Sequence, residues 1–142
     1  MEKYVRGVPL DVTSNESVAT DAKTVSQKTK ELTALINYHV IAFNGPIEYM
    51  PIKMYQCQHE VNYIGNIRMT QNFLSLLKST SSSKGARKRI IFTGTSGGPC
   101  IPCPPLLSAY MSSKFSCEAM VQCLRMEISV MDHDVDICVI NP

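Results

Sequence analysis

Hydrophobic residues in this chain follow two patterns, short continuous runs and stripes at helical spacing. The short runs predict four strands, at 7–12, 32–37, 89–94 and 135–140. The stripes with a three-to-four-residue period predict three helices, at about 14–30, 52–79 and 107–131. Because strands and helices alternate along the chain, the pattern predicts an α/β fold in which helices cover a parallel sheet.

Each predicted helix has an apolar face that should point into the core. The first helix carries a capping pattern, with Thr13 as the N-cap and Glu16 three residues later. The predicted apolar positions are Val18, Ala22 and Val25 in the first helix; Val61, Ile64, Ile67, Phe73, Leu74 and Leu77 in the second; and Cys117, Met120, Val121, Leu124 and Ile128 in the third.

Composition narrows the class of protein. With 142 residues, 44% hydrophobic and 18% charged, the chain should form one domain, 1–142, with a substantial core. A net charge of +2 gives no reason to expect nucleic acid as a partner. We expect no membrane span, because no run of about 18 apolar residues occurs. Six cysteines without a signal peptide indicate reduced thiols and an intracellular, by default cytoplasmic, protein.

The pair Cys100 and Cys103 offers one chemical alternative, because Cys-x-x-Cys can bind zinc or cycle between thiol and disulfide. Zinc needs four ligands, and the sequence has no second such pair. Redox activity favours a helix directly after the first cysteine, where this chain has prolines. We therefore expect no metal site.

Tyr110 and Lys114 are a second candidate for chemistry. Their spacing of four places both on one face of the third helix. An ammonium group beside a phenol favours the phenolate and lowers its pKa, as an acid–base tyrosine requires. The alternative is a lysine whose stem lies along a half-buried tyrosine without chemistry.

Three other segments bear on whether Tyr110 and Lys114 are catalytic. Ser96 follows the strand at 89–94, "EVNYIG" (60–65) lies within the second helix, and "LDVT" occupies 10–13. In this order, the segments resemble the short-chain dehydrogenase/reductase family from about residue 8 to the last residue. "GPIEYMP", "VNYIGNIRMTQNFLSLL" and "SAYMSSKF" are most similar to its retinol, steroid and hydroxybutyrate dehydrogenase branch.

The resemblance implies roles for individual residues. Tyr110 would exchange the proton at the substrate oxygen, Lys114 would assist it and hold the nicotinamide ribose, and Ser96 would bind the substrate oxygen. Asn62 would order a water in the proton relay. The implied contacts with NAD or NADP are Asp11, Val12, Asn37, Tyr110, Lys114 and Pro142. Asp11 matches the aspartate that touches the adenine ring.

Two departures from the family pattern are visible. The family has Asn-Asn-Ala-Gly where this chain has "NYHV" (37–40), so larger residues stand where backbone and cofactor approach. We expect His39 to be incidental there. The family's Thr-Gly-x-x-x-Gly-x-Gly turn is absent, and "TGTSGG" (93–98) resembles the catalytic serine loop instead. We therefore expect a partial doubly wound, Rossmann-type sheet without its first two strands, truncated at both ends.

The resemblance implies an oxidoreductase that transfers hydride between NAD(P)(H) and a small-molecule alcohol or ketone, of lipid-like type. The alternative is an inactive fragment that acts through its helices. Family members commonly pack the helices at 52–79 and 107–131 against a second subunit, so a homo-oligomer is expected. Mitochondria or the endoplasmic reticulum are alternative locations if an N-terminal segment precedes this sequence. The missing strands predict that residues 1–30 are loosely held and that the edge at 32–37 promotes association.

Overall fold

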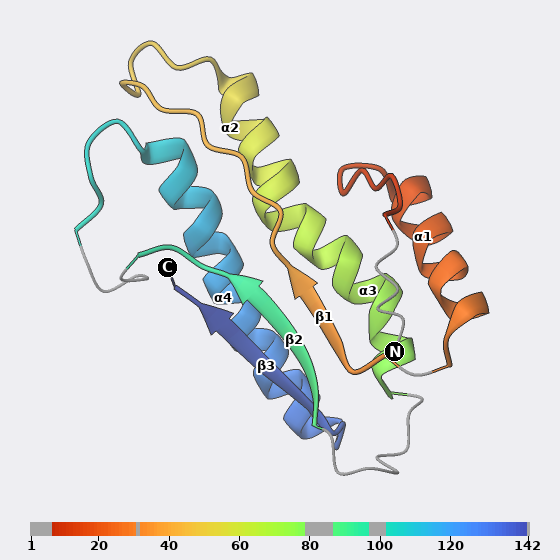
Figure 1. Ribbon diagram of the computed structural model, residues 1–142. Helices are drawn as coiled ribbons and strands as arrows, with labels where there is room; N and C mark the ends of the chain where they lie inside the picture. The colour runs from red at the N-terminus through yellow and green to blue at the C-terminus, as the bar shows by residue number, and fades with distance from the viewer. Residues whose placement is uncertain (1–6, 31, 79–86, 97–101, 142) are drawn as a thin grey trace.

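A three-stranded parallel sheet organises the computed structural model, which describes residues 7–30, 32–78, 87–96 and 102–141. The strands β1 (Ala34–Asn37), β2 (Lys88–Thr93) and β3 (Val135–Ile140) lie side by side in that order (Figure 1). Leu35 pairs with Ile90, which in turn pairs with Ile137. The predicted α/β class and three of the four predicted strands are confirmed.

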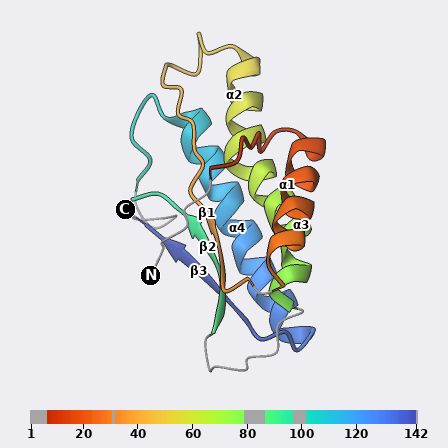
Figure 2. The same cartoon turned by 45° about the vertical axis from the view of Figure 1, so that its right-hand side comes forward.

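The helices lie together on one side of this sheet (Figure 2). They are α1 (Asn15–Lys28), α2 (Ile52–His59), the π-helix η1 (Glu60–Ile64), α3 (Gly65–Lys78) and α4 (Ser108–Val130). In the core, Leu35, Ile90 and Phe92 of the sheet pack with Phe73, Leu77 and Val121 of the helices. Among the described residues, no helix is long and apolar enough to cross a bilayer.

The predicted strand at 7–12 is wrong. Residues 7–11 are extended but pair with no strand of the sheet, and a turn follows at Val12 and Thr13. The Asp11 carboxylate closes this turn by accepting hydrogen bonds from Thr13 N and Thr13 Oγ1, at 2.9 and 2.7 Å. Side-chain bonding to the local backbone thus competes with strand pairing in this segment.

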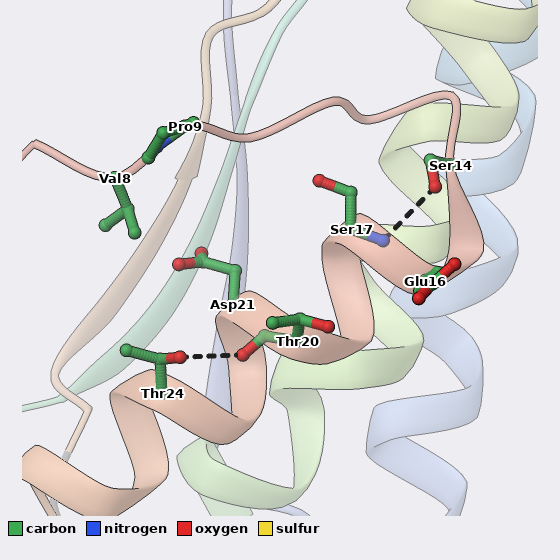
Figure 3. A pocket seen from close by; sticks show the side chains of 8 residues that line it. All are labelled: Val8, Pro9, Ser14, Glu16, Ser17, Thr20, Asp21 and Thr24. Carbon is green, nitrogen blue, oxygen red and sulfur yellow. Dashed lines mark hydrogen bonds between the residues drawn. The ribbon is translucent and has the colours of Figure 1, made fainter.

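The predicted cap is also shifted by one residue. Ser14, not Thr13, is the N-cap of α1, and its Oγ accepts a hydrogen bond from Ser17 N at 3.2 Å. Figure 3 shows this bond and the extended segment beside α1, where Val8 and Pro9 face a pocket of about 340 Å³. The segment is therefore held by its turn and by α1 rather than by the sheet.

The helix predicted at 52–79 is helical from α2 to α3, and the π-helix η1 connects these two α-helices. Its buried stripe differs from the predicted one, because Gln58, Asn62 and Asn66 are buried while Val61 and Ile64 are half-buried. Gln58 and Asn62 bond to the backbone of the segment that follows β1, whereas Asn66 donates to Asn62 O and Cys117 Sγ. Burial of Gln58 and Asn62 is tolerated because their amides satisfy backbone groups at 41 and 43, which pair with no strand in the described part of the chain.

The second face of the sheet carries no helix from the described part of the chain (Figure 2). Alternate residues of the strands point to this face, and they include Ile36, Ile91, Cys138 and Ile140. Ile36 keeps 61% of its surface exposed and Ile140 keeps 56%. Because parallel sheets are usually covered on both faces, this open apolar face is unusual.

Candidate functional site

Tyr110 and Lys114 meet on the first turns of α4, close to the end of β2. The Lys114 Nζ lies 5.8 Å from the centroid of the Tyr110 ring and donates a 2.7 Å hydrogen bond to the Thr93 carbonyl. Lys114 is only 3% exposed, and this burial lowers the pKa of its ammonium group. The strand end therefore fixes the lysine beside the tyrosine, as the four-residue spacing predicted.

Asn62 supports this pair from η1. Its side chain is fully buried, its Oδ1 accepts a 2.9 Å hydrogen bond from Ile41 N, and its Nδ2 donates to Ile41 O and Ser113 Oγ at 2.8 and 3.0 Å. Because Ser113 precedes Lys114, Asn62 joins the segment after β1 to the helix that carries the tyrosine and lysine. Its implied role in a water relay stays a prediction.

Gln58 makes a parallel clamp that the sequence interpretation missed. Its Oε1 accepts from Phe43 N at 3.0 Å, and its Nε2 donates to Phe43 O at 3.3 Å. Asn62 and Gln58 thus bond two alternate residues of the extended segment as a neighbouring strand would. A run of amides at four-residue spacing, Gln58, Asn62 and Asn66, was the signal in the sequence that could have revealed it.

Two further bonds hold α2 against the start of α4. The Tyr55 hydroxyl and Ser108 Oγ lie 2.6 Å apart, and His59 Nε2 lies 3.1 Å from Ser112 Oγ. Both serines flank Tyr110 in the first turns of α4. They fix the position of the tyrosine relative to α2, and the sequence interpretation did not identify them.

The predicted serine lies in the segment after β2. Ser96 is exposed there, whereas Pro142 and Cys100 fall outside the described residues. Cys103 is an exposed free thiol. Within the described ranges, no three histidine, cysteine or acidic side chains gather as metal ligands would.

The predicted cofactor contacts occupy separate places. Asp11 is exposed, and the hydrogen bonds from Thr13 lower the pKa of its carboxyl group. Val12 is half-buried over Gly65 of α3. Asn37 is 2% exposed on the helix-facing side of β1, and both polar atoms of its side chain lack a hydrogen-bond partner. The structure thus brings Tyr110 and Lys114 together and links Asn62 to their helix through Ser113, while Asp11 lies just before the turn that precedes α1 and Asn37 lies at the end of β1.

The residues around Lys114 fit the nicotinamide end of a dinucleotide. The Lys114 ammonium donates one of its three N–H groups to Thr93 O, which leaves two donors for ribose hydroxyls. The Tyr110 hydroxyl makes no hydrogen bond within the part of the chain that the structure describes, so it is available to a substrate oxygen. The acid–base role of Tyr110 and the supporting role of Lys114 stay predictions.

Comparison with known proteins gives this geometry a context. A family model described as short chain dehydrogenase matches residues 2–142. An NADPH-dependent 3-dehydrocapnine reductase of Ornithobacterium rhinotracheale is 34% identical over 113 residues, which make up 80% of this chain and 38% of that protein. The mitochondrial D-beta-hydroxybutyrate dehydrogenase of Rattus norvegicus is 29% identical over 142 residues, 97% of this chain and 38% of the relative.

Solved structures show the same arrangement of elements. An NADPH-bound carbonyl reductase from chicken fatty liver superposes with a TM-score of 0.83 at 24% identity, over 95% of this chain and 56% of that one. A Burkholderia phymatum short chain dehydrogenase/reductase in complex with NAD also gives a TM-score of 0.83, at 17% identity, over 96% and 47% of the two chains. The chain thus spans about half the length of the structures it resembles, and their common fold is the Rossmann type.

Proposed function

Because this chain belongs to the short-chain dehydrogenase family, we propose that it serves reversible hydride transfer between NAD or NADP and an alcohol or ketone. Similar solved structures hold NAD or NADP, and the family uses these cofactors. The observation that carries the proposal is the Tyr110–Lys114 pair, which Thr93 O fixes at the carboxyl end of β2. In open parallel α/β sheets, ligands bind at the carboxyl ends of the strands.

In the proposed reaction, the bound nicotinamide ring supplies or accepts the hydride. Tyr110 gives its phenolic proton to the carbonyl oxygen of a ketone, or takes the proton from an alcohol in the reverse direction. The Lys114 ammonium, 5.8 Å from the ring centroid, stabilises the phenolate that forms. Its remaining N–H bonds hold the ribose, and Ser96 would bind the substrate oxygen.

We assign the substrate to a lipid-like class of hydroxy acid, steroid or retinoid. The hydroxybutyrate in the name of the rat relative supports the hydroxy-acid member of this class. A contact with a second copy through the helices at 52–79 and 107–131 stays a prediction. A groove of about 250 Å³ between α3 and α4, which Ile67, Leu74 and Met120 help to line, gives such a contact an apolar surface.

Cofactor binding and turnover of the 142-residue chain test the proposal. Because the sequence lacks the family's glycine-rich turn and has "NYHV" at 37–40, we expect the fluorescence of NADH or NADPH to shift with weak affinity rather than tight binding. We also expect oxidation of the reduced cofactor with at least one member of a panel of keto acids, steroid ketones and retinaldehyde. The absence of both signals would contradict the proposed function for this chain.

The variant Tyr110→Phe tests the acid–base role separately. It keeps the ring and removes the hydroxyl, so turnover should fall by about 10²- to 10⁴-fold while cofactor binding persists. Tyr49→Phe, at an exposed tyrosine of the loop before α2, is the matched control and should keep full turnover. A Tyr110→Phe variant with more than about a tenth of the wild-type rate would assign the proton to another group.

A further inference from the structure

His39 lies two residues beyond the end of β1, in a place where the chain crosses close to α3. Its Nε2 is buried without a hydrogen-bond partner. A Cβ atom placed on Gly65 would lie 3.2 Å from this nitrogen and 3.0 Å from the Cγ2 of Val12. His39 and Val12 therefore meet over Gly65, so three separate parts of the chain touch at this point.

Gly65 makes this meeting possible because it has no side chain. Its backbone is helical, so the residue is needed for space and not for a left-handed conformation. Val12 belongs to the turn that precedes α1, and Gly65 is the first residue of α3. The contact over Gly65 thus helps to hold the N-terminal turn against the helix layer.

The charges around His39 are unbalanced. The positive charge of Lys114 on α4 acts on His39, and the Arg68 guanidinium of α3 donates a hydrogen bond to Val12 O, whereas the side chains that meet His39 over Gly65 carry no charge. The carboxylates closest in sequence to Gly65 and Val12 are engaged elsewhere, since Glu60 pairs with Arg68 and Asp11 accepts hydrogen bonds from Thr13. Burial lowers the pKa of His39, and the charge of Lys114 lowers it further.

We propose that His39 is a pH-sensitive latch between the N-terminal turn and the helix layer. The neutral imidazole packs with Val12 over Gly65 and holds the turn in place. A proton on His39 adds a second positive charge that Lys114 repels, while Glu60 and Asp11 are committed to other partners, and the contact over Gly65 opens. The latch works through packing and charge and needs no turnover, although the cation that acts on His39 is the proposed catalytic Lys114.

The direction of the pH effect follows from the depressed pKa. The unfolded chain takes up the proton at the ordinary histidine pKa of about 6.5, whereas the folded chain takes it up only at lower pH. Stability from this group is therefore complete above about pH 6.5 and falls as the pH drops below that value. One such proton lowers the folding equilibrium constant by up to about tenfold per pH unit until the folded-state pKa is reached.

Proton NMR titration of the three imidazoles tests the latch directly. His39→Gln identifies the His39 resonance by its loss, and we expect that resonance to titrate below about pH 6.5 in the wild type. Lys114→Met removes the neighbouring cation and should shift the midpoint upward. A wild-type His39 that titrates at or above the ordinary value would overturn the proposal, and so would a midpoint that Lys114→Met leaves in place.

Urea unfolding at pH 7.5 and 5.5 provides the second test. The folding constant of the wild type should fall by up to about tenfold more than that of His39→Gln between these two values. His133→Gln, in the turn between α4 and β3, is the matched control and should retain the wild-type acid sensitivity. If His39→Gln does not fold, His39→Ala takes its place.

Hydrogen exchange locates the opening. Amides of residues 12–18 should exchange faster at pH 5.5 than at 7.5 in the wild type, after correction for the intrinsic rates. His39→Gln should not show this difference. Equal pH dependence of unfolding and exchange in the wild type and in His39→Gln would show that no latch exists. Because these measurements require no turnover, they remain informative if the chain proves inactive.

Discussion

Asn62 makes three hydrogen bonds from a side chain with no exposed surface. Two of them need the Nδ2 group as a donor, to Ile41 O and Ser113 Oγ. An asparagine is suited to this place because it offers an acceptor and two donors in a planar group of small volume. The family resemblance pointed to this residue as part of a relay, whereas its bonds in this structure are those of a clamp.

Asn62→Asp removes both donors with little change in shape and should strongly destabilise the protein. A buried carboxylate would face the Ile41 carbonyl, and we expect the free energy of unfolding to fall by about 2–4 kcal/mol. Urea denaturation measures the loss. Asn44→Asp, at an exposed asparagine of the loop before α2, is the control and should change it by less than about 0.5 kcal/mol. Equal effects of the two substitutions would argue against the clamp.

At the scale of elements, α1 depends on a few attachments to α3. Val18 and Ala22 are its buried side chains. Arg68 of α3 reaches across to donate hydrogen bonds to Asn15 Oδ1 and Val12 O, and it also pairs with Glu60. The Arg68 guanidinium therefore connects the N-terminal turn and the start of α1 to α3.

Arg68→Lys should loosen α1 because a single ammonium cannot span three acceptors as a guanidinium fork does. We expect a loss of about 1–3 kcal/mol in local stability, seen as faster hydrogen exchange along Asn15–Lys28 than in the sheet. Arg87→Lys is the matched control, because Arg87 is an exposed partner of Asp136 at 3.5 Å. Unchanged exchange in α1 would mean that Val18 and Ala22 suffice to hold it.

The sequence predicted most elements because their apolar periods are strong. The strand at 135–140 and the helix at 107–131 agree with the structure to within one residue. The strand at 7–12 was wrong because an apolar run does not show whether a partner strand exists, and here Asp11 closes a turn instead. Burial of the amides Gln58 and Asn62 was not predicted, because their backbone partners in 41–43 lie far away in sequence.

The candidate site was predicted in part for similar reasons. The four-residue spacing of Tyr110 and Lys114 fixes their proximity locally, so it could be read from the sequence. The partner of Lys114, the Thr93 carbonyl, could not, because a backbone acceptor leaves no mark on residue types. The contact of His39 with Val12 over Gly65 joins three distant segments, and His39 was for that reason interpreted as incidental.

For the whole molecule, the open face of the sheet is the main feature that remains exposed. Ile36, Ile91, Cys138 and Ile140 face away from the helices, and β1 has a neighbour on one edge only among the described residues. Apolar faces and unpaired strand edges favour association with other chains. The exposed apolar face and the unpaired edge of β1 therefore provide a surface for the self-association that the sequence predicts at 32–37.

Ile36→Lys should weaken this association by about tenfold or more, because an isoleucine contributes about 1.5–3 kcal/mol when it is buried. Light scattering over a range of concentrations measures the average mass of the wild type and the variant. Ile52→Lys adds the same charge at an exposed position of α2 and should associate like the wild type. A wild type that stays monomeric at every concentration would contradict the prediction.

The parallel order of the strands has a consequence for the time course of folding. Ala34 pairs with Arg89 and Lys88 pairs with Val135, so each ladder joins residues far apart in the chain. No hairpin can nucleate such a sheet, and every strand pairing must wait for a large loop to close. We expect helices to form within microseconds and the sheet to assemble much more slowly. During that interval the apolar strands are unprotected, so refolding yield should fall as protein concentration rises.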